Sequence, residues 1–121
     1  MRDSGRIVAS VLQELKLKVK PGMITQELDD IAGAKVMQLG ALPSFKGYRG
    51  FPANICVSIN DEIVHGIPGE LVLEDGDIVS IDFGAIYKGF HGDSAITVPV
   101  GNISAEAKGL IEATEGALQA G

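Results

Sequence analysis

The chain has 121 residues, of which 45% are apolar, and a formal net charge of −6. This length allows one small domain with a modest core, and the lack of a basic cluster beyond Lys46 and Arg49 argues against nucleic acid as a partner. Cys56 is the only cysteine, so no internal disulfide can form, and no apolar run reaches the ~18 residues of a membrane helix. We therefore expect a soluble, cytoplasmic chain with no membrane partner.

Two helices are predicted first. Apolar residues recur at helical spacing from Ile7 to Leu15, and this first helix should end before Lys20. A second helix is predicted with Thr25 as its N-cap and Gly40 as its stop signal.

Strands dominate the rest of the chain. A loop rich in glycine and aromatic residues at 44–52 precedes a predicted strand at 55–59. A short strand at 63–64 and a tight loop at 66–69 follow, and Ser104 is predicted to cap a last helix. The predicted order along the chain is thus helix, helix, strands and a last helix, and we expect the α+β fold class.

A β-hairpin is predicted over the runs 77–87 and 90–100, with its turn at Lys88-Gly89. This register places Asp82 and Asp93 on one face of the sheet, as diagonal cross-strand neighbours. A turn longer or shorter by one residue would move one of the two to the opposite face.

Two carboxylates within apolar, β-branched runs call for a cation, because an unpaired buried charge costs several kcal/mol. Hard oxygen ligands suit Mg, Ca or Mn, and such a site needs further ligands to be complete. The alternative is a pair of turn or capping carboxylates that bind no ion. The two residues alone leave both interpretations open.

The other candidate residues have ordinary interpretations when they are considered alone. His65, which precedes Gly-Ile-Pro-Gly, is typical of a hydrogen-bonded loop histidine. Cys56 in an apolar strand is typical of a small buried hydrophobe. A nucleophilic role is not supported, because burial would raise the pKa of its thiol. Tyr48 and Phe51 would be packing residues of the loop or the core.

Five motifs follow one another between residues 48 and 93. They are YRGFP at 48–52, CVSIN at 56–60, HGIPG at 65–69, GDIVSID at 76–82 and GFHGD at 89–93. Their order and spacing resemble type I methionine aminopeptidase, a member of peptidase family M24. The resemblance implies the N-terminal half of a pita-bread fold, with an antiparallel sheet and helices on one face.

The resemblance covers residues 1–121 and implies a partial catalytic domain, truncated at both ends and without its pseudo-symmetric second half. In the family, two divalent metal ions (Co, Mn, Fe or Zn) are held by two aspartates of the first half and by one histidine and two glutamates of the second. Asp82 matches the aspartate that chelates one ion, and Asp93 matches the one that bridges both. We favour a structural role for His91, because the family's metal-binding histidine lies in the missing half.

The resemblance also changes the interpretation of the remaining candidates. His65 matches a catalytic histidine that hydrogen-bonds the scissile amide and stabilises the tetrahedral intermediate. Tyr48, Phe51 and Cys56 match residues that line the pocket for the methionine side chain of the substrate. The implied activity is metal-dependent removal of the N-terminal methionine from nascent proteins, with the ribosome as a candidate partner. We expect the 121-residue chain alone to be inactive and to self-associate through the face that the second half would cover.

Two alternatives stay open. One is another pita-bread hydrolase, such as a proline-specific aminopeptidase, against which the YRGFP and HGIP motifs and Cys56 argue. The other is a non-catalytic binding module of the same fold, against which the presence of Asp82, Asp93 and His65 argues.

Overall fold

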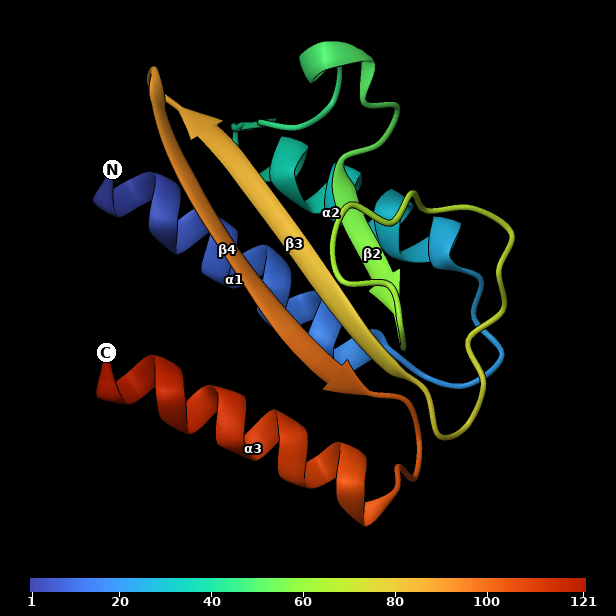
Figure 1. Cartoon of the computed structure of the whole chain (residues 1–121). Helices are drawn as coiled ribbons and strands as arrows, with labels where there is room; N and C mark the ends of the chain where they lie inside the picture. Colours follow the sequence, from blue (N-terminus) through green and yellow to red (C-terminus); the bar gives the residue numbers. More distant parts are fainter.

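The computed structural model describes residues 1–121 and contains one four-stranded antiparallel sheet with two helices packed on it (Figure 1). The helices are α1 (Arg2–Lys18), α2 (Thr25–Gln38) and α3 (Ala105–Ala120), and a 3-10 turn, η1, spans Tyr48–Gly50. The strands are β1 (Leu42–Pro43), β2 (Ile55–Ile59), β3 (Ile78–Tyr87) and β4 (Phe90–Pro99). The predicted α+β class is confirmed.

β3 is the central strand, and all its neighbours run antiparallel to it. β4 pairs with its whole length, whereas β1 pairs with residues 85–86 and β2 with residues 79–83. Because β4 occupies one edge of β3 completely, β1 and β2 follow each other along the other edge. This arrangement places Cys56 of β2 directly opposite Asp82 of β3.

The β3–β4 hairpin has the register that the sequence predicts. It turns at Lys88 and Gly89, whose φ angles of 50° and 81° are both left-handed, as a two-residue type I′ turn requires. Asp93 lies opposite Gly84, two residues from Asp82. Since side chains alternate along a strand, both carboxylates belong to the same face of the sheet.

The sheet has one covered face and one open face. The odd-numbered residues of β3 join the apolar residues of α1 and α2 in a single core. The largest fully buried side chains are those of Phe83, Leu15, Leu28, Ile55, Leu73 and Ile81. Full burial of a side chain of this kind contributes ~1.5–3 kcal/mol, so the core determines which face is covered. The even-numbered residues of β3, Asp82 among them, are left on the open face.

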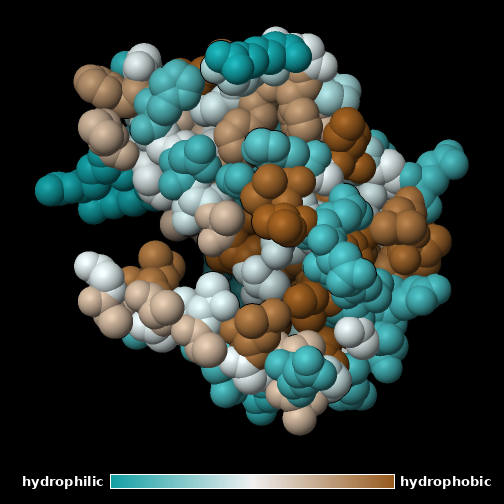
Figure 2. Space-filling model, in the orientation of Figure 1, coloured by the Kyte–Doolittle hydropathy of each residue, from teal (hydrophilic) through white to brown (hydrophobic).

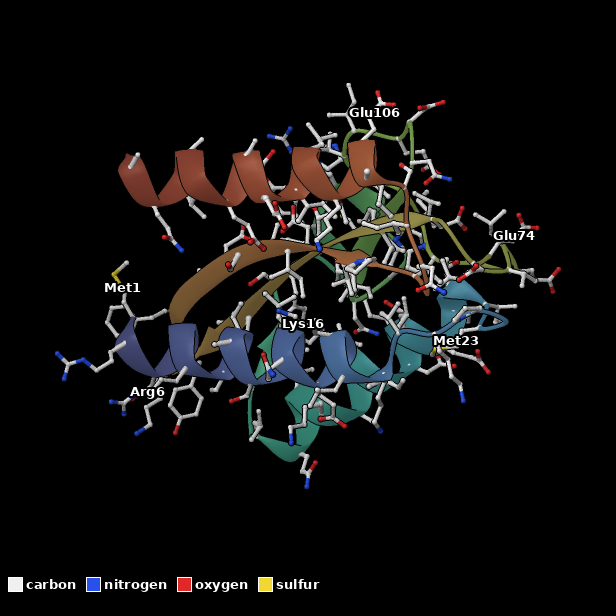
Figure 3. All side chains as sticks on the ribbon, turned by 90° about the horizontal axis from the view of Figure 1, so that it is seen from below. Met1, Arg6, Lys16, Met23, Glu74 and Glu106 are labelled. Atoms are coloured by element: carbon white, nitrogen blue, oxygen red, sulfur yellow. The ribbon has the colours of Figure 1, made fainter.

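α3 lies outside the helical layer that α1 and α2 form. It begins after β4 and lies on the side of the sheet away from α1 (Figures 1 and 3), and none of its residues is buried. The predicted cap is present, because the Ser104 Oγ accepts the Ala107 N–H at 3.1 Å. The apolar side chains of this helix stay in contact with solvent, with Leu110 60% and Leu118 79% exposed.

Two local predictions are wrong. Thr25 is the first residue of α2 and Ile24 is its N-cap, because the Thr25 hydroxyl is engaged with Gly69 instead. The segment 63–64 forms no strand. A backbone hydrogen bond from β2 to the Gly66 carbonyl already occupies that side of β2, so no neighbouring strand can pair there.

Candidate metal centre

Asp82 and Asp93 meet on the open face of the sheet. Asp82, in the middle of β3, is half-buried, and Asp93 on β4 is exposed. Asp93 lies close enough to Asp82 for its side chain and its charge to raise the pKa of the Asp82 carboxyl. The predicted convergence of the two side chains is therefore confirmed.

The electrostatics of this pair favour a bound cation. The pKa of Asp82 is raised to about 6, first by burial and then by the hydrogen bond and negative charge of Asp93, while the charge of His65 acts in the opposite direction. At neutral pH, two like charges therefore face each other between neighbouring strands. A divalent ion would relieve this repulsion, and carboxylate oxygens are suitable ligands for it.

The two aspartates are too few ligands for a complete metal site. No third histidine, cysteine, aspartate or glutamate joins the two aspartates in a group able to hold a metal ion. His91 shares their face, but its Nδ1 is hydrogen-bonded to the Ser44 Oγ at 3.1 Å, in agreement with the structural role that we favoured. The residues present thus fit a divalent ion as one half of a coordination site.

His65 lies in the loop that follows β2. It is exposed rather than packed in the core, and it has a left-handed φ of 62°. Its imidazole lies within electrostatic reach of Asp82, because its charge lowers the pKa of that carboxyl. His65 is therefore exposed near Asp82 and not buried in the core, and its catalytic role stays a prediction.

Cys56 lies beside the carboxylate pair as a neutral thiol. It is 5% exposed, and its pKa is raised to about 11 by burial and, to a lesser degree, by the charges of Asp82 and Asp93. Since the thiolate is the reactive form, Cys56 is no nucleophile at neutral pH. The rise in its pKa confirms the prediction from the sequence.

The aromatic loop is attached to the open face. Tyr48 is 63% exposed, and the half-buried Phe51 packs edge-on against Phe45, with ring centroids 6.4 Å apart. The Ser44 N–H donates to the Gly84 carbonyl at 2.9 Å, which extends the pairing of β1 with β3. The loop thus begins beside Gly84, which lies opposite Asp93 in the sheet.

Sequence reasoning missed the residues that attach this loop, Ser44 and Gly84. A Cβ at Gly84 would lie 3.0 Å from both the Phe45 ring and the Ser44 Cβ, so glycine permits this close approach. A glycine inside a β-branched strand was the available signal, since it often marks a close approach of another segment.

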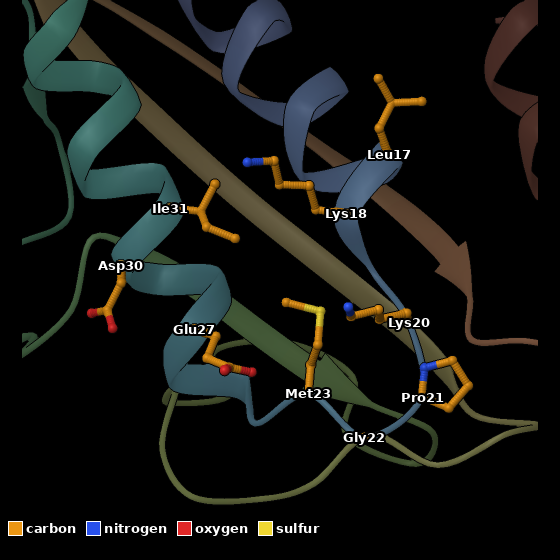
Figure 4. A pocket seen from close by; sticks show the side chains of 9 residues that line it. All are labelled: Leu17, Lys18, Lys20, Pro21, Gly22, Met23, Glu27, Asp30 and Ile31. Carbon is orange, nitrogen blue, oxygen red and sulfur yellow. The ribbon is translucent and has the colours of Figure 1, made fainter.

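A separate depression lies away from the carboxylate pair. It has a volume of about 780 Å³ and lies between the end of α1 and the start of α2, on the helical side of the sheet (Figure 4). Lys18, Lys20, Glu27 and Asp30 contribute charges of both signs to its lining, which gives it no preference for one ligand charge. The carboxylate pair, in contrast, favours one class of ligand, a cation.

The open face also leaves apolar side chains exposed. Beside His65, the side chains of Ile63, Val64 and Ile67 are 86%, 61% and 62% exposed. Figure 2, which looks onto this side of the sheet, shows apolar residues in brown interspersed with polar ones. No helix of the chain combines the length and the hydropathy that a bilayer span requires.

Comparisons with known proteins agree with this geometry. Methionine aminopeptidase 1 of Bacillus subtilis is 60% identical over 121 residues, which are 100% of this chain and 49% of that protein. The crystal structure of methionine aminopeptidase from Thermotoga maritima matches with a TM-score of 0.96 at 38% identity, over 98% of this chain and 48% of that one. An Escherichia coli aminopeptidase P matches less closely, with a TM-score of 0.71 at 29% identity, over 86% of this chain and 23% of that one.

The chain spans about half the length of the curated relatives that it matches. The solved structures confirm that its fold is the N-terminal half of the pita-bread architecture. Metallopeptidase family M24 matches residues 1–121. The chain therefore belongs to metallopeptidase family M24.

Proposed function

We propose that this chain is the N-terminal part of a methionine aminopeptidase catalytic domain and supplies half of its metal site. The observation that carries the proposal is the pair Asp82 and Asp93, which are diagonal neighbours on one face of the sheet and whose charges interact. The 60% identity to a methionine aminopeptidase supports it. The complete enzyme would act in the cytoplasm on the N-terminal methionine of nascent polypeptides, with the ribosome as a further partner.

In the complete enzyme, two aspartates of this chain would bind metal and one histidine would contact the substrate. Asp82 would hold one divalent ion and Asp93 would bridge two, with Co, Mn, Fe or Zn as the metal. Bound ions would supply Lewis-acid polarisation of a water molecule and of the peptide carbonyl. His65 would donate a hydrogen bond to the scissile amide and so stabilise the negative charge that develops on the carbonyl oxygen.

The aromatic loop would provide specificity for the methionine side chain. Tyr48 is exposed and Phe51 half-buried in the loop that begins beside Gly84, and Cys56 offers a neutral sulfur opposite Asp82. A flexible thioether contacts aromatic edges and sulfur favourably. These three residues would therefore line the pocket for the first side chain of the substrate.

A chimera tests this function. The chain would replace the matching half of the Bacillus subtilis enzyme, and hydrolysis of a Met-Ala-Ser peptide and of an Ala-Pro-Gly peptide would be measured with added Mn²⁺ or Co²⁺. We expect cleavage of the first peptide alone, and loss of it in the Asp93→Asn chimera. A folded chimera, judged by circular dichroism, that cleaves the proline peptide or neither peptide would contradict the proposal.

The 121-residue chain alone should not turn over the same peptide, because a site with two ligands holds its ions weakly. A turnover of roughly 1–10³ s⁻¹ would show that the other ligands are dispensable. Since Ile63, Val64 and Ile67 are exposed beside His65, we also expect the isolated chain to self-associate. Sedimentation velocity at increasing concentration measures this association, and a monomer throughout would refute it.

A further inference from the structure

His65 has a backbone conformation that its own side chain disfavours. Its φ of 62° lies in the left-handed region, which is costly for residues other than glycine. An exposed loop residue keeps such a conformation only when the surrounding structure imposes it. In this chain, the hydrogen bonds that impose it lie in the segment after His65, at Gly66 and Gly69.

The first of these attachments is to Ser58 of β2. The Ser58 hydroxyl, on a side chain that is only 3% exposed, accepts the Gly66 N–H at 3.1 Å. The Val57 N–H in turn donates to the Gly66 carbonyl at 2.9 Å. A Cβ at position 66 would collide with the Val57 carbonyl oxygen, so only glycine can follow His65 here.

The second attachment is to Thr25 at the start of α2. Its hydroxyl, also 3% exposed, accepts the Gly69 N–H at 2.8 Å and donates to the Gly69 carbonyl at 3.1 Å. The Gln26 N–H donates to the same carbonyl at 2.9 Å. The loop is thereby fixed one residue and four residues beyond His65, by two elements that are part of the rigid core.

We propose that Ser58 and Thr25 are positioning residues that hold the imidazole of His65 beside Asp82 and Asp93. Ser58 is suited to this role because it lies two residues from Cys56, which pairs with Asp82 across the sheet. The hydroxyl thus ties the histidine loop to the strands that carry the carboxylates. The value of this placement for catalysis rests on the proposed function, whereas the placement itself can be tested on the metal-free chain.

The test compares Ser58→Ala, Thr25→Ala and Thr25→Ser in the 121-residue chain by NMR. Ser80→Ala is the matched control, because Ser80 lies opposite Ser58 and its hydroxyl contacts Thr97 at 2.9 Å instead of the histidine loop. Amide exchange is measured at Gly66 and Gly69, and the backbone order parameter at His65.

Each alanine variant should accelerate amide exchange at its own glycine roughly tenfold, as expected for the loss of one hydrogen bond. The order parameter of His65 should fall toward that of a flexible loop, below about 0.6. Thr25→Ser should restore the wild-type values, and Ser80→Ala should change neither. Unchanged order at His65 in both alanine variants, or equal acceleration at all amides of β3, would overturn the proposal. Should Ser58→Ala not fold, the two Thr25 variants alone decide the matter.

Addition of Mn²⁺ gives a second readout, because a paramagnetic ion at the carboxylate pair broadens the imidazole signals near it. The chain has two histidines, His65 and His91, so His91 serves as the internal reference. The alanine variants should reduce broadening of the His65 signal relative to His91, and equal broadening in all variants would overturn the proposal. If neither signal broadens in the wild type, the half-site of the proposed function is refuted, and the metal-free measurements still decide on Ser58 and Thr25.

Discussion

Asp29 of α2 provides a demanding test of how the fold is held together. Its carboxylate is 5% exposed and accepts three hydrogen bonds, from the Asn54 N–H at 2.7 Å, the Asn54 Nδ2 at 3.0 Å and the Ile55 N–H at 3.0 Å. These bonds attach α2 to the start of β2, and β2 carries Cys56 to its place opposite Asp82. The substitution Asp29→Ala would leave all three donors buried without a partner.

Each unsatisfied buried donor costs ~1–3 kcal/mol, and partial relaxation around the vacated volume reduces the sum. We therefore expect Asp29→Ala to lower the free energy of unfolding by about 3–5 kcal/mol, a large part of the ~5–15 kcal/mol typical of a domain. In Asp29→Asn, one side-chain oxygen can still accept the two backbone N–H groups. The new side-chain NH2 group, however, faces the Nδ2 donor of Asn54 and cannot accept from it. This substitution should cost about 1–2 kcal/mol.

Urea unfolding followed by circular dichroism measures both variants, with an unchanged m-value as the sign that only stability has changed. Asp30→Ala is the matched control, because Asp30 is the exposed neighbour and its one contact is with the Gln26 Nε2 at 3.0 Å. It should cost no more than about 0.5 kcal/mol. Equal costs for Asp29→Ala and Asp30→Ala would refute the account of the buried carboxylate.

Two further predictions concern packing and pH. A Cβ at Gly92 would lie 2.8 Å from the Ser4 carbonyl carbon, so Gly92→Ala should push α1 off β4 and cost about 1–3 kcal/mol in thermal unfolding. The control Gly109→Ala meets no atom within 4 Å inside α3 and should be neutral or stabilising; the reverse order of the two would contradict the packing. Because the folded pKa of Asp82 is raised from 3.8 to about 6, its stability contribution is present below pH 4 and is lost as the pH rises through 6. Relative to Asp82→Asn, the metal-free wild type should therefore lose about 1 kcal/mol between pH 4 and 7, after allowance for solvent screening, and parallel pH profiles of urea midpoints would count against this assignment.

The hairpin was predictable because its determinants are local. A two-residue Lys88-Gly89 turn between runs of period two leaves one register that buries a continuous apolar face. The face shared by Asp82 and Asp93 follows from that register by parity alone.

Features that depend on tertiary contacts were not predictable in the same way. Thr25 looks like an N-cap in sequence, yet its hydroxyl bonds to Gly69, which is 44 residues away in the chain. The apolar residues at 63–64 looked like a strand, but the edge of β2 beside them is taken by Gly66. Local propensity is overridden in both cases by a partner that is remote in sequence.

Binding of Mn²⁺ to the 121-residue chain, followed by isothermal titration calorimetry at pH 7, tests the central claim most directly. If Asp82 and Asp93 form half of a metal site, the wild type should bind with a Kd of about 10⁻³ M, the weak end of protein sites. Asp82→Asn and Asp93→Asn should each weaken binding at least tenfold, and the double variant no further, while Asp61→Asn at an exposed turn should have no effect. Equal affinity in the wild type and in either single variant of the pair, or no binding at all, would contradict the claim.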